Sequence, residues 1–342
     1  MINFYLIFVL LNLVIFFNLK KISKILNVFD VPDKKLKTHI KRTPLLGGTI
    51  FLINLLALSI YQLIFLKEFL FLENNFFKIR DIIGIIFLIS SFYFLGLYDD
   101  KNNLNPFKKI FLSIIFIIIS ITLNKELLIV NFSLSFYDSK IFLENFSIIF
   151  TIFCFVILMN SLNFYDGING QSCIYFLIAF SYLLISTKKY EFYFFIIIIL
   201  IFLLILNLMN LLFLGDNGIY ILSIILSIAL IYEHNVYGNI IFADEIFIVL
   251  FLPGVDLLRL TISRLLKGNN PFYGDRNHIH HLLNQKFSLL NTNLILVILG
   301  ILPIIFFNFL KLNFFLVSII FLIIYGLLIQ FLRSDDKKHS HR

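Results

Sequence analysis

The sequence predicts an all-α polytopic membrane protein, and three observations support this fold class. Of its 342 residues, 60% are hydrophobic and only 14% are charged, and the mean hydropathy is +0.97. Apolar stretches recur along the whole chain, each close to the roughly 20 residues that a helix needs to cross a bilayer. A single soluble core could not bury so much apolar surface, so we expect one membrane domain over residues 1–342.

Eleven apolar stretches account for this domain. We expect helices over residues 2–19, 45–66, 82–98, 110–124, 146–160, 171–187, 192–214, 218–233, 243–258, 293–310 and 312–332. The first stretch is read as a retained helix, because no basic residue precedes it and no small-residue cleavage site follows it. The segment from Asn124 to Phe146 contains the alternating string VNFSLSF, which indicates a short hairpin on the outer face.

Five polar segments interrupt the apolar pattern, and counting crossings between them places all five on one side of the bilayer. They cover residues 30–48, 98–109, 160–170, 215–218 and 256–281. Most of the 28 Lys and Arg residues fall on the same side, which is the asymmetry expected of cytoplasmic loops. This placement explains why the chain has more basic than acidic residues, so the positive net charge does not require a nucleic-acid partner.

The charge asymmetry fixes a predicted orientation, with the amino terminus outside and the carboxyl terminus in the cytoplasm. The cytoplasmic loops that could form an active site are then about 20–44, 99–109, 160–171, 215–218 and 259–290. A charge at the centre of a membrane helix costs roughly 2.5 to 3.5 kcal/mol on insertion scales, so charges beside hydrocarbon are usually kept for chemistry. We therefore expect the five segments to share one active site.

Three of these segments carry acidic or amide side chains at predicted helix ends. Asp99 and Asp100 could form a Mg²⁺-associated pair or a general base, or only a solvated helix end neutralised by nearby lysines. Asn160, Asn163 and Asp166 are spaced three apart and share one helical face, where their oxygens suit Mg²⁺ or merely cap the helix. Asp216 lies between two glycines at the start of a helix and could equally be a capping residue.

The other two segments are basic. The string GDRNHIHH contains Arg276, His278, His280 and His281, whose spacing favours anion binding over a helical metal site. A solvated basic loop is the alternative. The first segment carries Lys35 and His39 before Pro44, where they could hold a lipid phosphate or only sense anionic lipid.

Taken in order, the five segments resemble the polyprenyl-phosphate N-acetylhexosamine-1-phosphate transferases. The similarity covers Asp30 to His281, and its most specific parts are the strings NSLNFYDGING and DRNHIHH. The resemblance implies a multi-spanning enzyme of the bacterial inner membrane that starts cell-envelope polysaccharides. It also implies a UDP-N-acetylhexosamine donor, a polyprenyl phosphate acceptor and surrounding membrane lipid as partners, and it is compatible with a homodimer.

The resemblance also implies roles for individual residues. Asn163 and Asp216 would bind Mg²⁺, for which Mn²⁺ could substitute. Asp99 and Asp100 would lie nearest the attacking lipid phosphate, with Asp99 deprotonating or orienting it, and Asp166 would support the nucleotide side. The substrate-binding residues would be Lys35, His39, Asn160, Arg276, His278, His280 and His281.

The chain departs from the family pattern at three positions. Asn169 stands where a second Asp is common, Ile219 replaces a Ser after GDxG, and Gly274 replaces a Pro before DR. The form HIHH resembles the branch that uses UDP-GlcNAc or a relative, with the phospho-MurNAc-pentapeptide transferases of peptidoglycan synthesis as the alternative. A transporter or flippase is a different class, but such proteins tend to carry midplane charges and repeated halves, and neither pattern is present here.

Overall fold

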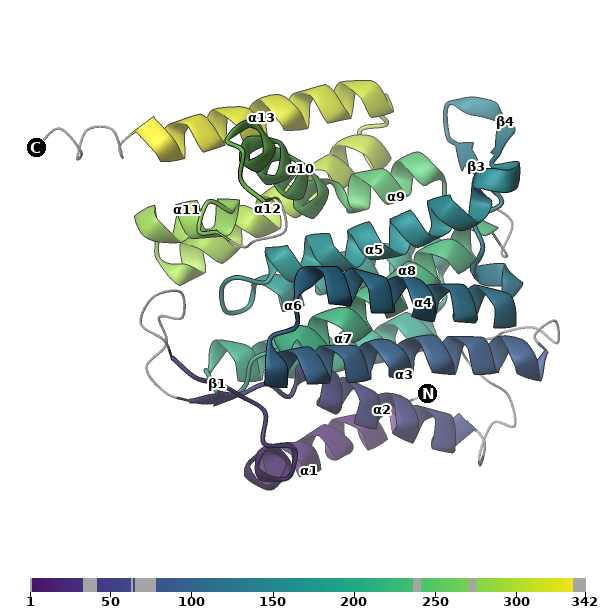
Figure 1. Ribbon diagram of the computed structural model, residues 1–342, viewed down its shortest axis with the longest axis vertical. Helices are drawn as coiled ribbons and strands as arrows, with labels where there is room; N and C mark the ends of the chain where they lie inside the picture. Colours follow the sequence, from purple (N-terminus) through teal and green to yellow (C-terminus); the bar gives the residue numbers. More distant parts are fainter. Residues whose placement is uncertain are drawn as a thin grey trace, which may run out of the picture.

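The computed structural model describes residues 2–32, 42–62, 64, 78–235, 241–270 and 275–334. Within these ranges the chain forms α-helices and two small pairs of strands (Figure 1). The helices are α1 (Ile2–Leu26), α2 (Gly47–Tyr61), α3 (Ile79–Asn102), α4 (Pro106–Leu123), α5 (Ser147–Tyr165), α6 (Gln171–Thr187), α7 (Tyr190–Leu208), α8 (Gly215–Asn235), α9 (Ala243–Val249), α10 (Phe251–Leu266), α11 (Ile279–Lys286), α12 (Leu289–Asn308) and α13 (Phe314–Ser334).

The helices confirm the predicted class of membrane protein. Among the described residues, eight helices are long and apolar enough to cross a bilayer, or nine if the bent pair α9 and α10 counts as one span. Helices α2 and α6 are apolar but shorter. Every predicted stretch contains a helix, while the number of eleven crossings and the orientation stay predictions.

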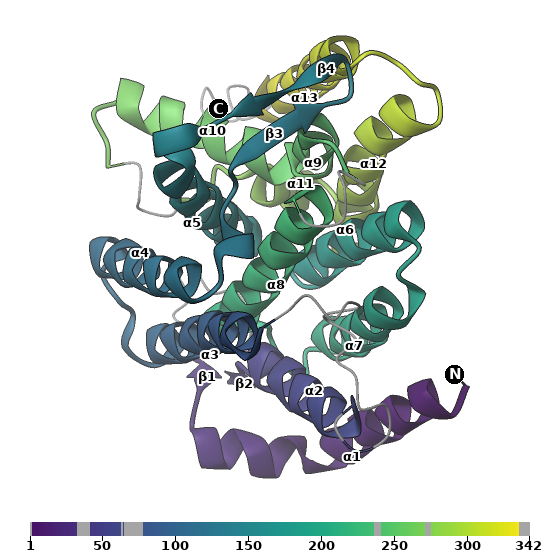
Figure 2. The same cartoon turned by 90° about the vertical axis from the view of Figure 1, so that its right-hand side faces the viewer.

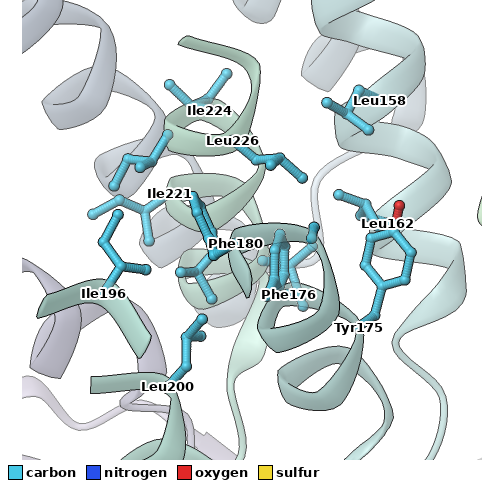
Figure 3. Packing of buried hydrophobic residues seen from close by; sticks show 14 of the residues in the cluster. Leu158, Leu162, Tyr175, Phe176, Phe180, Ile196, Leu200, Ile221, Ile224 and Leu226 are labelled. Carbon is cyan, nitrogen blue, oxygen red and sulfur yellow. The ribbon is translucent and has the colours of Figure 1, made fainter. Parts of the chain in front are cut away.

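Helix α8 occupies the centre of the bundle, as Figure 2 shows. It is buried on all sides, which fits a helix that is apolar around its whole circumference. Phe176 and Phe180 of α6 and Leu200 of α7 pack beside Ile221 and Leu226 of α8 (Figure 3). The central helix is therefore fixed by side-chain packing along its length, and its amino-terminal end is held in one place.

The segment predicted as one span over 243–258 is instead two helices that meet at an angle of 73°. Pro253 lies in the first turn of α10, where its missing N–H is tolerated, but a continuous helix would need that N–H to bond to Val249. The chain therefore bends after α9. The bend carries Asp256, Arg259 and Arg264 of α10 toward α11.

Short strands close both ends of the bundle. Strands β3 (Asn131–Leu134) and β4 (Tyr137–Phe142) form the predicted antiparallel hairpin, and β1 (Phe29–Asp30) pairs with β2 (Thr43–Pro44) at the other end. The hairpin bonds to Asp244 at the start of α9 through the backbone N–H of Ser135, at 2.9 Å. The described parts of the five polar segments lie at the opposite end of α8 from this hairpin (Figure 1).

Candidate active site

Asp99 lies in the last turn of α3 with only 1% of its surface exposed. Its Oδ1 accepts a hydrogen bond from the backbone N–H of Leu104 at 2.8 Å, and its Oδ2 accepts one from the Tyr220 hydroxyl at 2.9 Å. The Nζ of Lys109 lies 2.5 Å from the same Oδ2. A buried carboxylate is costly unless it is paired and hydrogen-bonded, and here both conditions are met.

The sequence predicts only that nearby lysines could neutralise Asp99 and Asp100, whereas the structure gives Lys109 a specific position. It extends from the first turn of α4 toward Asp99, and its Nζ also lies 3.8 Å from Oδ2 of Asp216. Lys108, the adjacent residue, is exposed. The amphipathic period of α4 could have identified Lys109 in the sequence, because that period directs one of two neighbouring lysines toward the interior of the protein.

Asp100 caps a helix to which it does not belong. Its Oδ1 accepts from the backbone N–H of Asp216 at 2.8 Å, and its Oδ2 accepts from that of Asn217 at 3.0 Å. The first N–H groups of a helix have no partner within the helix, and a carboxylate there is favoured by the helix dipole. The sequence suggested Asp216 as a capping residue of α8, whereas in the structure the cap comes from α3.

Asp216 is the carboxylate of this cluster that could still bind a ligand. About 29% of its side chain is exposed, and it is close enough to Asp99 and Asp100 to interact with them electrostatically. Lys109 supplies one positive charge against these three carboxylates. No group of three or more His, Cys, Asp or Glu side chains within the described ranges has metal-binding geometry.

The third polar segment forms the end of α5 and the turn into α6. Asn160 and Asn163 lie on α5 and are half-buried, and Asp166 follows the helix at an exposed position. The side chain of Asn160 donates to the backbone oxygen of Val156 at 2.8 Å. Asn160 and Asn163 therefore have the predicted helical spacing, whereas Asp166 lies one residue beyond the helix end.

Amide side chains from three elements hold the turn that follows Asp166. The backbone N–H of Gly170, which has a positive φ of 87°, donates to Oδ1 of Asn207 at 2.5 Å. Asn169 donates through its side chain to Asn210 at 2.6 Å, and its backbone oxygen accepts from Asn293 at 2.9 Å. Asn169, which replaces a common family Asp, is therefore part of an amide network that fixes the turn.

His278 is buried within a second polar cluster. Its Nδ1 bonds to Oδ2 of Asp256 at 2.8 Å, and its Nε2 lies 3.4 Å from a guanidinium nitrogen of Arg264. Its ring stacks on Phe164 of α5, with centroids 5.8 Å apart. Asp256 and Arg264 thus hold the two ring nitrogens of His278 from opposite sides.

Asp256 is the centre of this second cluster and was not singled out as a site residue in the sequence. Its Oδ1 accepts from Arg259 at 2.7 Å and from the Tyr325 hydroxyl of α13 at 2.6 Å. The backbone N–H of Ile279 lies 3.3 Å from the same oxygen. Helices α10, α11 and α13 are thus joined through one buried carboxylate.

His280 faces the turn after α5. Its Nδ1 lies 3.1 Å from the side-chain nitrogen of Gln171, and its Nε2 points at the backbone of Gly167. A Cβ on Gly167 would lie only 1.9 Å from this Nε2. The third and fifth polar segments are therefore in direct contact, as a shared site requires.

The electrostatics of α11 favour neutral imidazoles. Burial lowers the pKa of His280 well below its usual value, and the neighbouring His281 and His278 lower it further. Burial, with His278 and Arg276, also lowers the pKa of His281 to about 4. At neutral pH these side chains can offer hydrogen bonds to an anion, but they carry no positive charge.

An apolar groove of about 400 Å³ runs between α4, α5 and α10. Ile110 and Ile114 of α4 form one wall, and Leu257 and Thr261 of α10 form another. Asn160 and Phe164 of α5 also line it. Ile110 follows Lys109 in the chain and Phe164 stacks on His278, so the groove connects the two polar clusters.

Some predicted site residues cannot be placed. Lys35 and His39, and with them Gly274, lie outside the described residues. Arg276 is half-buried in the turn before α11. Ile219 is fully buried in α8, so no hydroxyl is supplied at that position.

These features define a helical membrane protein with two connected polar clusters, one around α3, α4 and α8 and one around α5, α10 and α11. Residues 82–234 match the model of glycosyl transferase family 4, the family of polyprenyl-phosphate hexosamine-1-phosphate transferases. The predicted resemblance is confirmed over these residues, and the matched segment contains Asp99, Asp100, Lys109, Asn163, Asp166 and Asp216. A comparison with curated proteins found no match.

Proposed function

We propose that the protein transfers N-acetylhexosamine-1-phosphate from a UDP-sugar to polyprenyl phosphate and releases UMP. The family match supports a transferase of sugar phosphate onto polyprenyl phosphate. The observation that carries the proposal is the position of Lys109, which pairs with Asp99, approaches Asp216 and adjoins the apolar groove. A lipid phosphate needs both a cationic site for its head and an apolar site for its tail.

The groove between α4, α5 and α10 suits the tail of the lipid. Most of its lining is Ile, Val, Leu and Phe, and its polar lining residues are Asn160 and Thr261. A tail lying along these helices would bring its phosphate to the end of the groove beside Lys109. Helix α10 reaches this position because of the bend after α9.

We propose that Mg²⁺ binds at the acidic cluster. Asp99 and Asp100 are already occupied by protein donors, so Asp216, with part of its carboxylate exposed, is the available ligand. Mg²⁺ usually takes one or two protein carboxylates and fills its remaining positions with water and substrate phosphate. Asp216 and Asn163 would hold the ion, which when bound would neutralise charge on the donor diphosphate.

The reaction consists of one displacement at phosphorus. An oxygen of the lipid phosphate attacks the phosphorus that carries the sugar, and the bond from this phosphorus to the oxygen bridging to UMP breaks. Lys109 would bind the attacking phosphate and Asp99 would orient the ammonium group, so that catalysis depends on positioning and charge stabilisation. Asp166, His281 and Arg276 would contact the nucleotide side, with the imidazole of His281 acting as a neutral hydrogen-bonding group.

The test is release of UMP by the purified full-length protein in detergent, supplied with UDP-GlcNAc, polyprenyl phosphate and Mg²⁺. We expect turnover that stops with EDTA and that falls by at least about 100-fold in Asp216→Asn and in Asn163→Ala. Asp138→Asn, which changes an exposed carboxylate on β4, serves as the matched control and should retain full turnover. Equal turnover in Asp216→Asn and Asp138→Asn would contradict the assignment of the metal ligands.

The sugar is expected to be GlcNAc or a close relative, because the string DRNHIHH resembles the polysaccharide-initiating branch. Supplying UDP-GlcNAc and UDP-MurNAc-pentapeptide together and weighing the lipid product by mass spectrometry separates the two branches. A product that carries the muramoyl pentapeptide would assign the chain to peptidoglycan synthesis instead. Movement of lipid-linked sugar across vesicles without UMP release would support a flippase.

We place this activity in the bacterial inner membrane with the acidic cluster facing the cytoplasm, where UDP-sugars are made. The polar clusters at one end of α8 and the hairpin at the other are consistent with that arrangement. A homodimer is compatible with the apolar outer faces of helices such as α1, which are also compatible with lipid.

A further inference from the structure

Asn217, the third residue of the string GDNG, is fully buried at the point where α2, α3 and α8 meet. Its side-chain Oδ1 accepts from the backbone N–H of Gly48 at 2.7 Å. Its Nδ2 donates to the backbone oxygen of Leu45 at 3.2 Å and to Oδ2 of Asp100 at 2.5 Å. One amide group therefore contacts the start of α2 and the end of α3.

Two glycines allow this close approach of three helices, because a side chain at either position would collide with the backbone of Asn217. A Cβ on Gly48 of α2 would lie 2.4 Å from the backbone oxygen of Asn217, and one on Gly96 of α3 would lie 2.5 Å from its Cα. Backbone atoms cannot move aside as the end of a flexible side chain can. Asn217 is thus enclosed on two sides by backbone, and its amide has one arrangement in which all its hydrogen bonds are made.

Asp100 completes the arrangement from the other side. Its two oxygens receive the N–H groups of Asp216 and Asn217 and the side-chain amide of Asn217. A carboxylate that accepts three such hydrogen bonds has its oxygens occupied by protein donors. The bonds fix the first turn of α8, and Asp216 is carried on that turn.

We propose that Asp100 and Asn217 form a positioning pair that holds the carboxylate of Asp216 beside Lys109 and Asp99. The inference rests on the proposed transferase function and deepens it, because it gives Asp100 a positioning role in place of direct action on the lipid phosphate. Asn217 is a residue that sequence reasoning did not select. Loss of the pair would let the first turn of α8 loosen and displace Asp216 from the position that the reaction needs.

Three variants of the full-length protein test the pair. Asp100→Asn places an amide donor against the amide of Asn217, and Asn217→Asp places two carboxylates together. The double variant Asp100→Asn/Asn217→Asp restores the side-chain bond between the two positions with the roles exchanged, but the amide introduced at position 100 has one oxygen for the two backbone N–H groups at the start of α8, and Leu45 loses its donor. We expect each single variant to lower kcat by about 100-fold, with a smaller change in KM, since a misplacement of about 1 Å can cost that much. The double variant should recover part of this loss and exceed both single variants in kcat, because the effects of residues in contact are not additive.

Hydrogen exchange measured by mass spectrometry gives a readout that needs no turnover. A peptide covering residues 211–222 should exchange faster in both single variants and return toward the wild-type rate in the double variant. Asn54→Ala is the control, because Asn54 is also fully buried but pairs with Asn12 of α1, away from the site. It should lower the melting temperature while leaving exchange of residues 211–222 and kcat nearly unchanged.

The outcomes separate the pair from the function on which it rests. Unchanged exchange in the single variants overturns the positioning pair. Exchange that recovers in the double variant without recovery of kcat also overturns it, because the charge of Asp100 is then needed in the reaction itself. If the wild type releases no UMP but the exchange pattern holds, the pair stands and the transferase function fails.

Discussion

The ammonium group of Lys109 pairs with the buried carboxylate of Asp99, with Nζ 2.5 Å from Oδ2. The two residues lie on successive helices, α3 and α4, and the turn between them brings the side chains together. The pair lies beside Asp216 and at the end of the apolar groove. It is therefore the part of the site where a lipid phosphate and the acidic cluster would meet.

Lys109→Gln should lower kcat by at least about 100-fold, since removing one charge-stabilising donor from an active site typically costs that much. Lys108→Gln is the matched control, because Lys108 is adjacent but exposed. It should stay within about twofold of the wild type, as surface changes usually have small effects. Both are measured by UMP release at saturating substrate.

Loss of stability must be distinguished from loss of function in this comparison. Lys109→Gln leaves Asp99 buried without its cation, so the melting temperature should fall. Adding Asp99→Asn removes the unpaired charge, and the double variant should regain much of that stability while staying inactive. Recovery of turnover in the double variant would mean that Lys109 serves only to neutralise Asp99.

Gly167→Ala should damage the second cluster. The new Cβ would lie 1.9 Å from Nε2 of His280, and this ring cannot move freely because it packs against His278, His281 and Tyr165. We expect a drop in melting temperature and a fall of about 100-fold in kcat from the displaced groups.

Gly254→Ala provides the control for the alanine substitution itself. Gly254 lies in α10, and apart from the backbone of its own helix and its chain neighbours, no described atom would lie within 4 Å of its new Cβ. Ala is the better helix former, so this variant should be neutral or slightly more stable. Wild-type kinetics in Gly167→Ala would show that contact between the third and fifth polar segments is not needed for activity.

Asp256→Asn should disrupt the joint between α10, α11 and α13. The amide cannot accept all the bonds that Asp256 takes from Arg259, Tyr325 and His278, so both turnover and melting temperature should fall. Tyr325→Phe removes the bond to Asp256 and the bond that Nε of Arg259 donates to the Tyr325 hydroxyl at 2.8 Å, so it should cost about 2 kcal/mol of stability, with most of the turnover kept. Equal loss in both variants would assign the effect to Tyr325 rather than to the carboxylate.

Much of the fold followed from local sequence patterns. Apolar length predicted where helices form, because a membrane helix must satisfy its own backbone bonds. The spacing of Asn160, Asn163 and Asp166 predicted a shared helical face, and the alternating string near Ser133 predicted the hairpin. The bend after α9 was missed, although Pro253 was visible, because the hydrophobic pattern continues across it.

The site was harder to predict, since its decisive contacts join residues far apart in the chain. Asp100 and Asn217 are separated by more than one hundred positions and meet only because Gly48 and Gly96 let three helices converge. Asp256 likewise depends on α13 for its Tyr325 contact. Local patterns identify which residues are polar, whereas tertiary packing decides which of them are occupied by protein partners and which stay open to substrate.

The protein should lose stability as the pH falls from about 6.5 toward 4. The pKa of His281 is lowered to about 4 in the folded protein, against about 6.5 for an unperturbed His. Its contribution to stability is therefore fully present above pH 6.5, and it is lost as the pH falls through 4 because the unfolded state takes up the proton first. His280, whose pKa is lowered in the same direction, adds to this effect.

Melting temperatures recorded between pH 7.5 and 4 test this linkage. His281→Gln cannot take up the proton, so its melting temperature should depend less steeply on pH over this range. The test compares the slopes of melting temperature against pH, so a constant difference in melting temperature between the two proteins does not affect it. Identical slopes would show that the pKa of His281 is the same in the folded and unfolded protein, which would contradict the lowered pKa.

Cysteine labelling in intact cells tests the predicted orientation. In a background with Cys154 and Cys173 replaced by alanine, single cysteines are introduced at exposed positions at both ends of the bundle. Those at Lys101 and Lys267 lie near the polar clusters, and those at Lys125 and Asp138 lie near the hairpin. A membrane-impermeant maleimide should label the second pair at once, and should label the first pair only after the membrane is permeabilised.

This outcome follows from the excess of Lys and Arg in the loops on the side of the acidic cluster. Each cysteine must first react in detergent, so that failure to label in cells reports the membrane barrier and not a buried side chain. Labelling of Lys101→Cys and Lys267→Cys in intact cells, with protection of the hairpin positions, would place Asp99, Lys109 and Asp216 outside. A cytoplasmic UDP-sugar could not then reach them, and the donor in the proposed reaction would have to be replaced.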